Sequence, residues 1–311
     1  MLIAAAVILI LILLSLLAGL VLVRMTFTRG HFDPYTHPPT DPEFLTHDKN
    51  AKAGERWLKS MKPEECEIRS FDGLTLRALF LPAEVPTDRT ILCEHGYHCY
   101  GSYEFGNISR RLHEMGCNLL IPDDRAHGRS EGRVIGFGNL DARDCVSWCG
   151  YLVQRFGSGA RIALYGVSMG AAAVLTASGR EDLPRQVRGV AADCGFSSGW
   201  REVCAVCRRD FHLPSFPFVY AGDLWLKLLA GYSLRKDNPI DMVKKAKVPI
   251  LILHGDQDTF VPTDMGKELF EAIPGEKRLK IIKGARHAQS YDTDPEGYAK
   301  AFQELLTLAG M

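Results

Sequence analysis

The sequence shows no excess of charge of either sign. Its 311 residues include 37 Lys plus Arg and 37 Asp plus Glu, so the formal net charge at pH 7 is zero. No basic stripe is visible either, although nucleic-acid binding proteins concentrate Lys and Arg on one face. We therefore expect no nucleic-acid partner. The length suits one large α/β domain or two smaller ones.

Charged side chains are missing from the first apolar segment. Leu2–Val23 carries none, and a helix needs about 20 apolar residues to cross a bilayer. A cleaved secretory signal peptide is the alternative, but no Lys or Arg precedes the run and no small-x-small cleavage site follows it. We expect a retained single-pass transmembrane anchor over residues 1–24, which makes the membrane a partner.

Two further absences indicate on which side of the membrane the rest of the chain lies. No basic residue precedes the apolar segment, whereas Arg24 and Arg29 follow it, and the positive-inside rule then places the rest of the chain in the cytoplasm. The nine cysteines show no disulfide-like spacing, which is typical of a reducing compartment. Both observations favour a cytoplasmic domain.

Residues 25–65 are expected to combine a linker with a helix. His31–Pro42 is rich in Pro, Asp and Thr and predicts an extended linker. Lys49–Met61 has the composition of a helix. This helix either docks on the following domain or lies along the membrane surface.

Residues 66–311 have the pattern of an α/β domain. Apolar runs alternate with amphipathic segments, which predicts a mostly parallel sheet with helices on both faces. An Asp-Gly turn joins the first two strands as an antiparallel hairpin. The predicted strands are Cys66–Ser70, Leu74–Leu81, Thr90–Glu94, Asn118–Pro122, Arg161–Val167, Val187–Asp193, Val248–His254 and Arg278–Ile282. The predicted helices include Ser102–Met115, Leu140–Phe156, Thr263–Ala272 and Pro295–Leu308.

One segment interrupts this alternation. Residues 197–246 lie between two predicted strands and are far longer than an ordinary crossover. The segment is rich in aromatic residues, which either form the core of extra helices or line a pocket under a cap. Because it directly follows the C-terminal end of a strand, where open α/β sheets bind ligands, we expect a short helical cap.

The pentapeptide Gly166–Gly170 reads Gly-Val-Ser-Met-Gly and lies between a buried strand and a run of helix formers. In this context Gly-x-Ser-x-Gly is the signature of a nucleophile elbow, a tight turn that exposes a serine. A Cβ at either glycine would collide with the neighbouring strand or helix. An ordinary turn with Ser168 as helix N-cap is the alternative. As a nucleophile, Ser168 would use the Met169 amide as an oxyanion donor.

A serine nucleophile needs a histidine base and a carboxylate that orients the base. On such a sheet these follow in the order Ser, acid, His. His287 stands directly after the last predicted strand and is the expected base. Asp256 and Asp258 follow the preceding strand, and one of them should close the turn through its own backbone. Asp258 can reach farther toward the histidine and is the expected acid, with Asp193 a lesser candidate.

The loop after the Thr90–Glu94 strand is the place for a second oxyanion donor. His95-Gly96-Tyr97 stands there, and the backbone N–H of Tyr97 is the expected donor. A plain tight turn is the alternative.

Two short patterns could suggest a metal or a redox site. Cys204-x-x-Cys207 has no further zinc ligands at suitable spacing, and no thioredoxin-like unit surrounds it. His95-x-x-His98 is a weaker pattern still. We expect neither a metal nor a cofactor.

Together these motifs resemble the α/β-hydrolase fold superfamily, in its serine aminopeptidase-like and esterase-like branch. The shared features, from about residue 66 onward, are His-Gly-Tyr, the elbow, the run Asp124–Ser130, His-Gly-Asp-Gln-Asp-Thr-Phe-Val-Pro and Gly-Ala-Arg-His-Ala-Gln-Ser. The resemblance implies that Asp124–Ser130 forms a structural loop near the site. The apolar N-terminus also resembles a group of bacterial membrane-anchored hydrolases described as cell-surface hydrolases, which conflicts with a cytoplasmic domain.

The resemblance implies acyl transfer without a cofactor. Ser168, Asp258 and His287 would form the catalytic triad, with Tyr97 and Met169 as the oxyanion hole. The expected substrate is a small acyl ester or thioester, and the anchor and the cap aromatics favour a lipid-like acyl group. One alternative is an aminopeptidase, which would need acidic cap residues to hold the substrate amine. The other is a non-catalytic scaffold that binds a ligand or a partner.

Overall fold

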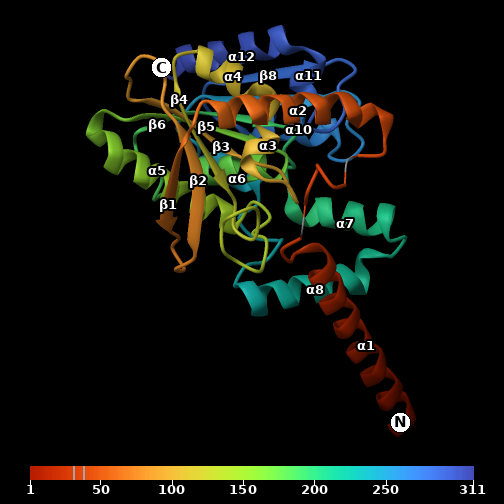
Figure 1. Ribbon diagram of the computed structural model, residues 1–311. Coiled ribbons are helices and arrows are strands. Elements are labelled where there is room, and N and C mark those ends of the chain that lie inside the picture. The colour runs from red at the N-terminus through yellow and green to blue at the C-terminus, as the bar shows by residue number, and fades with distance from the viewer. Residues whose placement is uncertain (31, 38) are drawn as a thin grey trace.

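A single mixed sheet forms the centre of the structure, a computed structural model that describes residues 1–30, 32–37 and 39–311. Within this part of the chain, eight strands pair in the order β1-β2-β4-β3-β5-β6-β7-β8 (Figure 1). β2 runs antiparallel to both β1 and β4, and the remaining pairs are parallel. The strands are β1 (Glu64–Arg69), β2 (Thr75–Leu81), β3 (Arg89–Glu94), β4 (Asn118–Asp123), β5 (Arg161–Val167), β6 (Val187–Asp193), β7 (Ile250–Gly255) and β8 (Lys277–Ile282).

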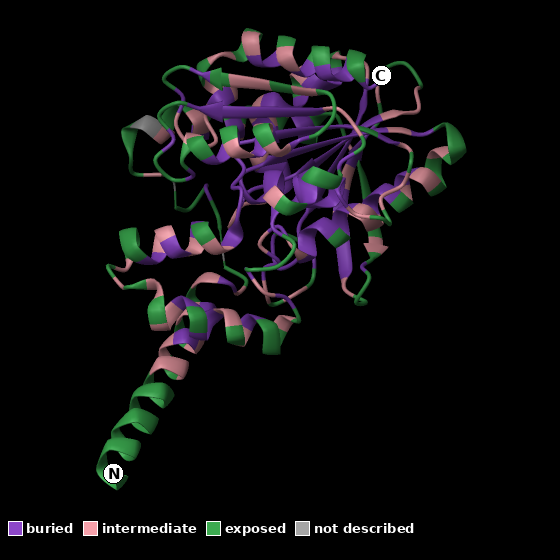
Figure 2. Cartoon of the chain, turned by 180° about the vertical axis from the view of Figure 1, so that it is seen from behind, coloured by how far each residue is buried: buried purple, intermediate pink, exposed green. Residues whose placement is uncertain are grey.

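Helices cover both faces of this sheet, because side chains alternate along each buried strand. In β5, Leu164 points into a core shared with α5, α6 and α10. Ala163 and Tyr165 point into the opposite core, shared with α2, α4 and α12. Figure 2 shows the sheet buried almost throughout. The helices are α2 (Pro42–Ser60), α4 (Gly106–Glu114), α5 (Leu140–Phe156), α6 (Met169–Ser178), α10 (Thr263–Ala272) and α12 (Pro295–Leu308).

The predicted fold class, an α/β-hydrolase-type sheet with helices on both faces, is confirmed. One predicted helix, Ser102–Met115, is wrong, because the chain forms α3 (Gly101–Glu104) and α4 on either side of Phe105. The Phe105 ring is buried against Tyr165, with ring centroids 5.2 Å apart. The break therefore lies where this ring enters the core.

Helix α2 lies across α4 on one face of the sheet. It begins at Pro42 rather than at the predicted Lys49. A Cβ on Gly54 would lie 1.5 Å from the Gly106 carbonyl oxygen, so the two backbones touch at this crossing. Of the predicted linker His31–Pro42, residues 31 and 38 lie outside the described part of the chain.

Segment 197–246 contributes two helices that lie beyond the C-terminal ends of the strands, α7 (Gly199–Asp210) and α8 (Ser215–Ala230) (Figure 1). The chain then returns to the sheet through α9 (Pro239–Met242) and the 3-10 turn η2 (Val243–Lys245). We refer to α7 and α8 as the cap helices. The short elements η1 (Gly157–Gly159) and α11 (Ser290–Thr293) complete the fold.

Helix α1 (Leu2–Thr26) joins the cap helices, and its first half projects away from the domain (Figures 1 and 2). It is long and apolar enough to cross a membrane. Its second half packs along α8, where a Cβ on Gly19 would lie 2.5 Å from Ala221 Cβ. The Trp225 indole N–H donates to the Leu16 carbonyl oxygen at 2.8 Å.

Candidate active site

Ser168 occupies the sharp turn between β5 and α6. Its backbone has φ 55° and ψ −114°, a strained conformation for a residue with a side chain. A Cβ on Gly166 would lie 2.2 Å from the Gly170 carbonyl oxygen, and a Cβ on Gly170 would lie 1.9 Å from that of Glu94. The two glycines are therefore sterically required, as the elbow argument expected.

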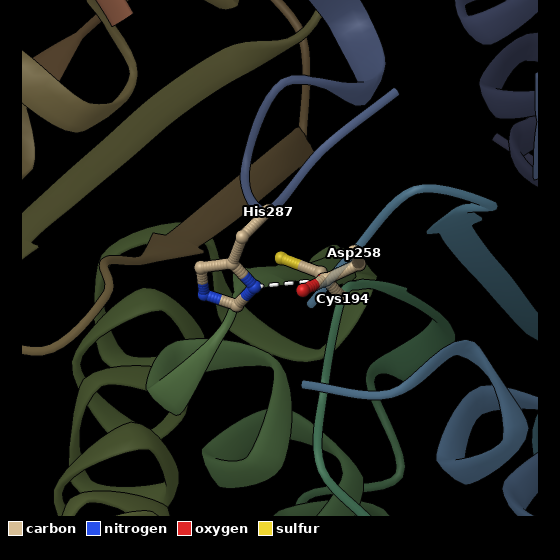
Figure 3. Close-up of side chains that lie close together, drawn as sticks. All are labelled: Cys194, Asp258 and His287. Atoms are coloured by element: carbon tan, nitrogen blue, oxygen red, sulfur yellow. Dashed lines mark hydrogen bonds and ion pairs between the residues drawn. The ribbon is translucent and has the colours of Figure 1, made fainter. Parts of the chain in front are cut away.

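The structure brings together the three side chains selected from the sequence. Ser168 Oγ lies 2.9 Å from His287 Nε2, and His287 Nδ1 lies 2.8 Å from Asp258 Oδ2 (Figure 3). In this series of hydrogen bonds, the Ser168 hydroxyl can donate to His287 Nε2 while His287 Nδ1–H donates to the Asp258 carboxylate. This arrangement is the one in which an imidazole accepts a serine proton.

The surroundings of Asp258 favour the ionised form of its carboxyl group. Its Oδ1 accepts the backbone N–H groups of Phe260 and Val261, both at 2.9 Å. Burial alone would raise the pKa of Asp258, but hydrogen bonds from His254 and His287 outweigh it and hold the pKa well below its ordinary value. Asp258 thus closes the turn and binds the histidine at the same time.

The other two candidate acids join loops instead. Asp256 accepts the backbone N–H of Gly284 at 2.7 Å and so connects the acid loop to the histidine loop. Asp193 accepts a hydrogen bond from the Ser290 hydroxyl at 2.8 Å. Both contacts stabilise the segment that carries His287.

Cys194 lies beside the Asp258–His287 pair (Figure 3). The ligand atoms of these three residues lie within 4.8 Å of one another, a spacing that could hold a metal ion. Burial raises the pKa of the Cys194 thiol well above its ordinary value. The Asp258–His287 hydrogen bond accounts for the arrangement without an ion. Among the described residues this is the one such cluster, and it includes neither Cys204 and Cys207 nor the His95-x-x-His98 pattern.

The loop that follows β3 lies against Ser168. A Cβ on Gly96 would lie 3.5 Å from Ser168 Cβ, and Tyr97 and Met169 line the same cavity as Ser168. The Tyr97 hydroxyl donates to the Thr26 carbonyl oxygen at the end of α1. The loop is thus held between the elbow and the N-terminal helix.

The run Asp124–Ser130 supports this loop through two histidines. His127 Nε2 accepts the backbone N–H of His98 at 3.1 Å, while its Nδ1–H donates to the Arg125 carbonyl oxygen at 2.9 Å. Burial lowers the pKa of His127 to about 2, so the ring stays neutral and can accept. His95 Nε2 likewise accepts the Asp124 N–H at 2.9 Å. The family resemblance implied that this run lies near the site, but it gave no sign of the contact with His98.

Ser168 opens into a largely apolar cavity. Both cap helices line it, and so does the end of α1. The wall contributed by α1 was missed in the sequence, because nothing in an apolar span indicates which domain surface it contacts. Wall residues from α1 and α8 include Leu22, Val23, Phe218, Val219 and Leu226.

Glu202 of α7 also lines this cavity. Its side chain is buried, and neither carboxylate oxygen has a hydrogen-bond partner among the described residues. Burial raises the pKa of Glu202 to about 7. Asp223, the other acidic cap residue in the wall, accepts hydrogen bonds from Ser233 and from the Leu234 N–H. Of the two acidic cap residues that line the cavity, Glu202 is the one whose carboxylate has no hydrogen-bond partner among the described residues.

A second cavity meets the first at Ser168 and Tyr97 and also reaches His287. Its wall includes the polar side chains of His47, Asp48 and Glu104. Ser168 therefore lies between an apolar cavity and a more polar one.

Comparisons with known proteins agree with this architecture. A family model described as "Serine aminopeptidase, S33" matches residues 220–294, a stretch that includes Asp258 and His287. The uncharacterized protein YqkD of Bacillus subtilis is 30% identical over 223 residues, covering 71% of this chain and 72% of YqkD.

Solved structures share the fold. The Pyrococcus furiosus esterase Pf2001 superposes with a TM-score of 0.65 at 22% identity, covering 80% of this chain and 92% of that one. A bacterial membrane phospholipase A superposes with a TM-score of 0.60 at 18% identity, covering 86% and 93%. With its mixed sheet, its serine elbow and these relatives, the chain belongs to the α/β-hydrolase superfamily, in the same family as YqkD.

Proposed function

We propose that the protein is a membrane-anchored serine hydrolase that cleaves carboxylic ester or thioester bonds through an acyl-enzyme intermediate. The observation that carries this proposal is the hydrogen-bonded chain from Ser168 through His287 to Asp258, which ends at an apolar cavity. Two structural neighbours, an esterase and a membrane phospholipase A, support the same reaction class.

The proposed reaction begins at Ser168. Ser168 Oγ attacks the carbonyl carbon while His287 Nε2 takes the hydroxyl proton, and Asp258 stabilises the resulting imidazolium. The backbone N–H groups of Tyr97 and Met169 would hold the oxyanion, where loss of one donor typically costs about 10²–10³-fold in rate. His287 then protonates the leaving alcohol or thiol, and it later activates the water that releases the acid.

The two cavities suggest where the two parts of the substrate bind. The apolar cavity under the cap helices suits the acyl chain, since it is lined by aliphatic and aromatic side chains. The more polar cavity beside His287 suits the leaving group, which must receive its proton from that residue. A small acyl ester with an apolar chain fits both compartments.

We also propose that residues 1–24 stay on the mature protein as its anchor. Val23 is buried and lines the cavity, so cleavage after the apolar segment would open one cavity wall. Residues 25–65 then form the linker and docking helix, and residues 66–311 form the hydrolase domain, with the cap at 197–246. Arg24, Arg29 and the free thiols favour the cytoplasmic side, where protease added to intact cells would leave the domain uncut.

A substrate panel tests the reaction class. We expect the full chain in detergent to hydrolyse p-nitrophenyl esters, with kcat/KM rising as the acyl chain lengthens, because each buried methylene contributes roughly 0.8 kcal/mol. Aminoacyl p-nitroanilides serve as the comparison. Hydrolysis of the anilides without the esters would contradict the ester assignment.

One observation favours a second candidate function, an aminopeptidase. The unpartnered carboxylate of Glu202 in the cavity could bind a substrate ammonium group. With a pKa near 7, it would be ionised mainly above that pH, whereas a free amine is protonated mainly below about 8. Amine binding would therefore be strongest between these values.

The substitution Glu202→Gln tests this second function. If it operates, the variant raises KM for aminoacyl anilides about tenfold or more near pH 7.5 and flattens the dependence of KM on pH, because the neutral amide cannot pair with the ammonium. The same variant with p-nitrophenyl butyrate is the control and should change little. An unchanged KM for the anilides excludes the amine-binding role.

A further inference from the structure

The exposed stretch of α1 is shorter than the hydrocarbon core of a bilayer. Leu2–Leu14 is exposed along its whole length, and at about 1.5 Å per residue it is about 20 Å long. The hydrocarbon core of a bilayer is about 30 Å thick. A bilayer that encloses this stretch has room for about 10 Å more of the helix, enough to surround its next turns. Those turns are the ones packed against α8, where Trp225 donates to Leu16 and Gly19 contacts Ala221.

Helix α8 has the exposed apolar surface expected of a helix that lies in the hydrocarbon core of a bilayer. Its exposed side chains include an apolar set. Tyr220, Leu224 and Leu228 follow one another at intervals of four residues and share one side of the helix. Phe216 lies at a kink near the start of α8, where its ring is 5.4 Å from that of Tyr220, measured between centroids. We call this set the α8 apolar face. Its members are Phe216, Tyr220, Leu224, Leu228 and Leu229, which are 71%, 45%, 45%, 65% and 55% exposed.

Polar groups border the α8 apolar face, and Tyr220 and Leu224 share a groove with Arg143, Arg180 and Asp237 of the domain. Tyr220 and Trp225 belong to the residue types that concentrate at the interface between lipid and water. Lys227 on α8 and Arg24 at the end of α1 are exposed cations that can reach lipid phosphates. Asp223, the acid on α8, is turned toward Ser233 and Leu234 and forms an ion pair with Arg235.

We propose that the α8 apolar face lies in the lipid bilayer beside α1 and that the active-site cavity takes its acyl chain directly from the membrane. This inference rests on the proposed function and names its substrate class, a membrane-resident acyl ester. Helices α1 and α8 border the lipid on their outer side and line the cavity on their inner side through Leu22 and Phe218. An acyl chain that enters between them stays in apolar surroundings on its way to Ser168.

An activity ratio tests the proposal with the full chain in vesicles of phosphatidylcholine and phosphatidylglycerol. The substrates are p-nitrophenyl palmitate in the vesicle and p-nitrophenyl butyrate in the buffer. The double substitution Leu228→Glu/Leu229→Glu should lower the palmitate-to-butyrate rate ratio about tenfold or more, since charged groups are excluded from hydrocarbon. Val85→Glu/Met61→Glu, at exposed apolar sites outside α1 and α8, should keep the wild-type ratio.

The outcomes distinguish delivery of the substrate from the membrane from ester hydrolysis itself. An unchanged ratio in the α8 variant, with both substrates cleaved, overturns membrane delivery and leaves the ester hydrolase intact. Failure of the wild type to cleave either substrate overturns the proposed function and, with it, this inference.

A spectroscopic measurement locates the α8 apolar face without relying on activity. Leu228→Trp in vesicles of brominated phosphatidylcholine should show more fluorescence quenching than the wild type, because bromine atoms on the acyl chains quench a nearby indole. Val85→Trp is the matched control and should show no added quenching. Equal quenching in the two variants would contradict the placement of α8 in the lipid.

Discussion

Ser168→Ala is expected to lower kcat/KM for p-nitrophenyl esters by about 10⁴-fold or more. Alanine removes the Oγ that lies 2.9 Å from His287 Nε2, so no acyl-enzyme can form. The variant should also lose covalent labelling by a fluorophosphonate probe, which reacts with an activated serine. Because the substitution deletes one oxygen from a residue that is 9% exposed, circular dichroism should show the wild-type fold.

Ser178→Ala provides the matched control for this experiment. Ser178 is a buried serine at the far end of the same helix, and its hydroxyl donates to the Leu175 carbonyl oxygen at 2.6 Å. This variant should keep both its labelling and its activity. Labelling that persists in Ser168→Ala, or a folded wild-type protein that is never labelled, would show that Ser168 is not the nucleophile.

Asp258→Asn is expected to lower kcat by about 10⁴-fold, the size of effect seen when a triad aspartate becomes an amide. The Asn carbonyl oxygen can still accept the Phe260 and Val261 N–H groups, so the turn should persist. The amide nitrogen would instead face His287 Nδ1 and favour the tautomer with its proton on Nε2. That tautomer cannot accept the Ser168 proton. Steady-state kinetics with p-nitrophenyl butyrate measures the loss.

Asp256→Asn separates a chemical role from a structural one in the same loop. Asp256 accepts the Gly284 N–H, and an amide oxygen can take over that hydrogen bond. We expect a loss of less than about tenfold, within the range of a small displacement of the histidine loop. If Asp256→Asn were the more damaging substitution, the acid would have been assigned to the wrong residue.

Much of the candidate site can be predicted from short stretches of sequence. A strand, a turn and a helix are consecutive around Ser168, and the steric conflict that excludes a Cβ from Gly166 and Gly170 arises within that stretch and the adjacent β3. His287 could be found because parallel strands end at one edge of the sheet, so the loop after the last strand reaches that edge.

The choice of acid shows where sequence reasoning was incomplete. One aspartate was expected to close the turn, with Asp258 reserved for the histidine. In the structure Asp258 does both, because its two oxygens face different partners, and Asp256 reaches the histidine loop instead. Spacing along the chain does not indicate how one carboxylate distributes its lone pairs.

By itself, the sequence determined the α/β class, the elbow and the loop positions of Asp258 and His287, since periodicity and short-range sterics act between neighbouring residues. Only the tertiary structure decided that α1 closes the cavity, that Glu202 faces it and that His127 supports the loop after β3. The Trp225–Leu16 hydrogen bond joins residues 209 positions apart. Such contacts depend on where the sheet places each helix and loop, because no local pattern encodes the partner of an apolar or buried polar face.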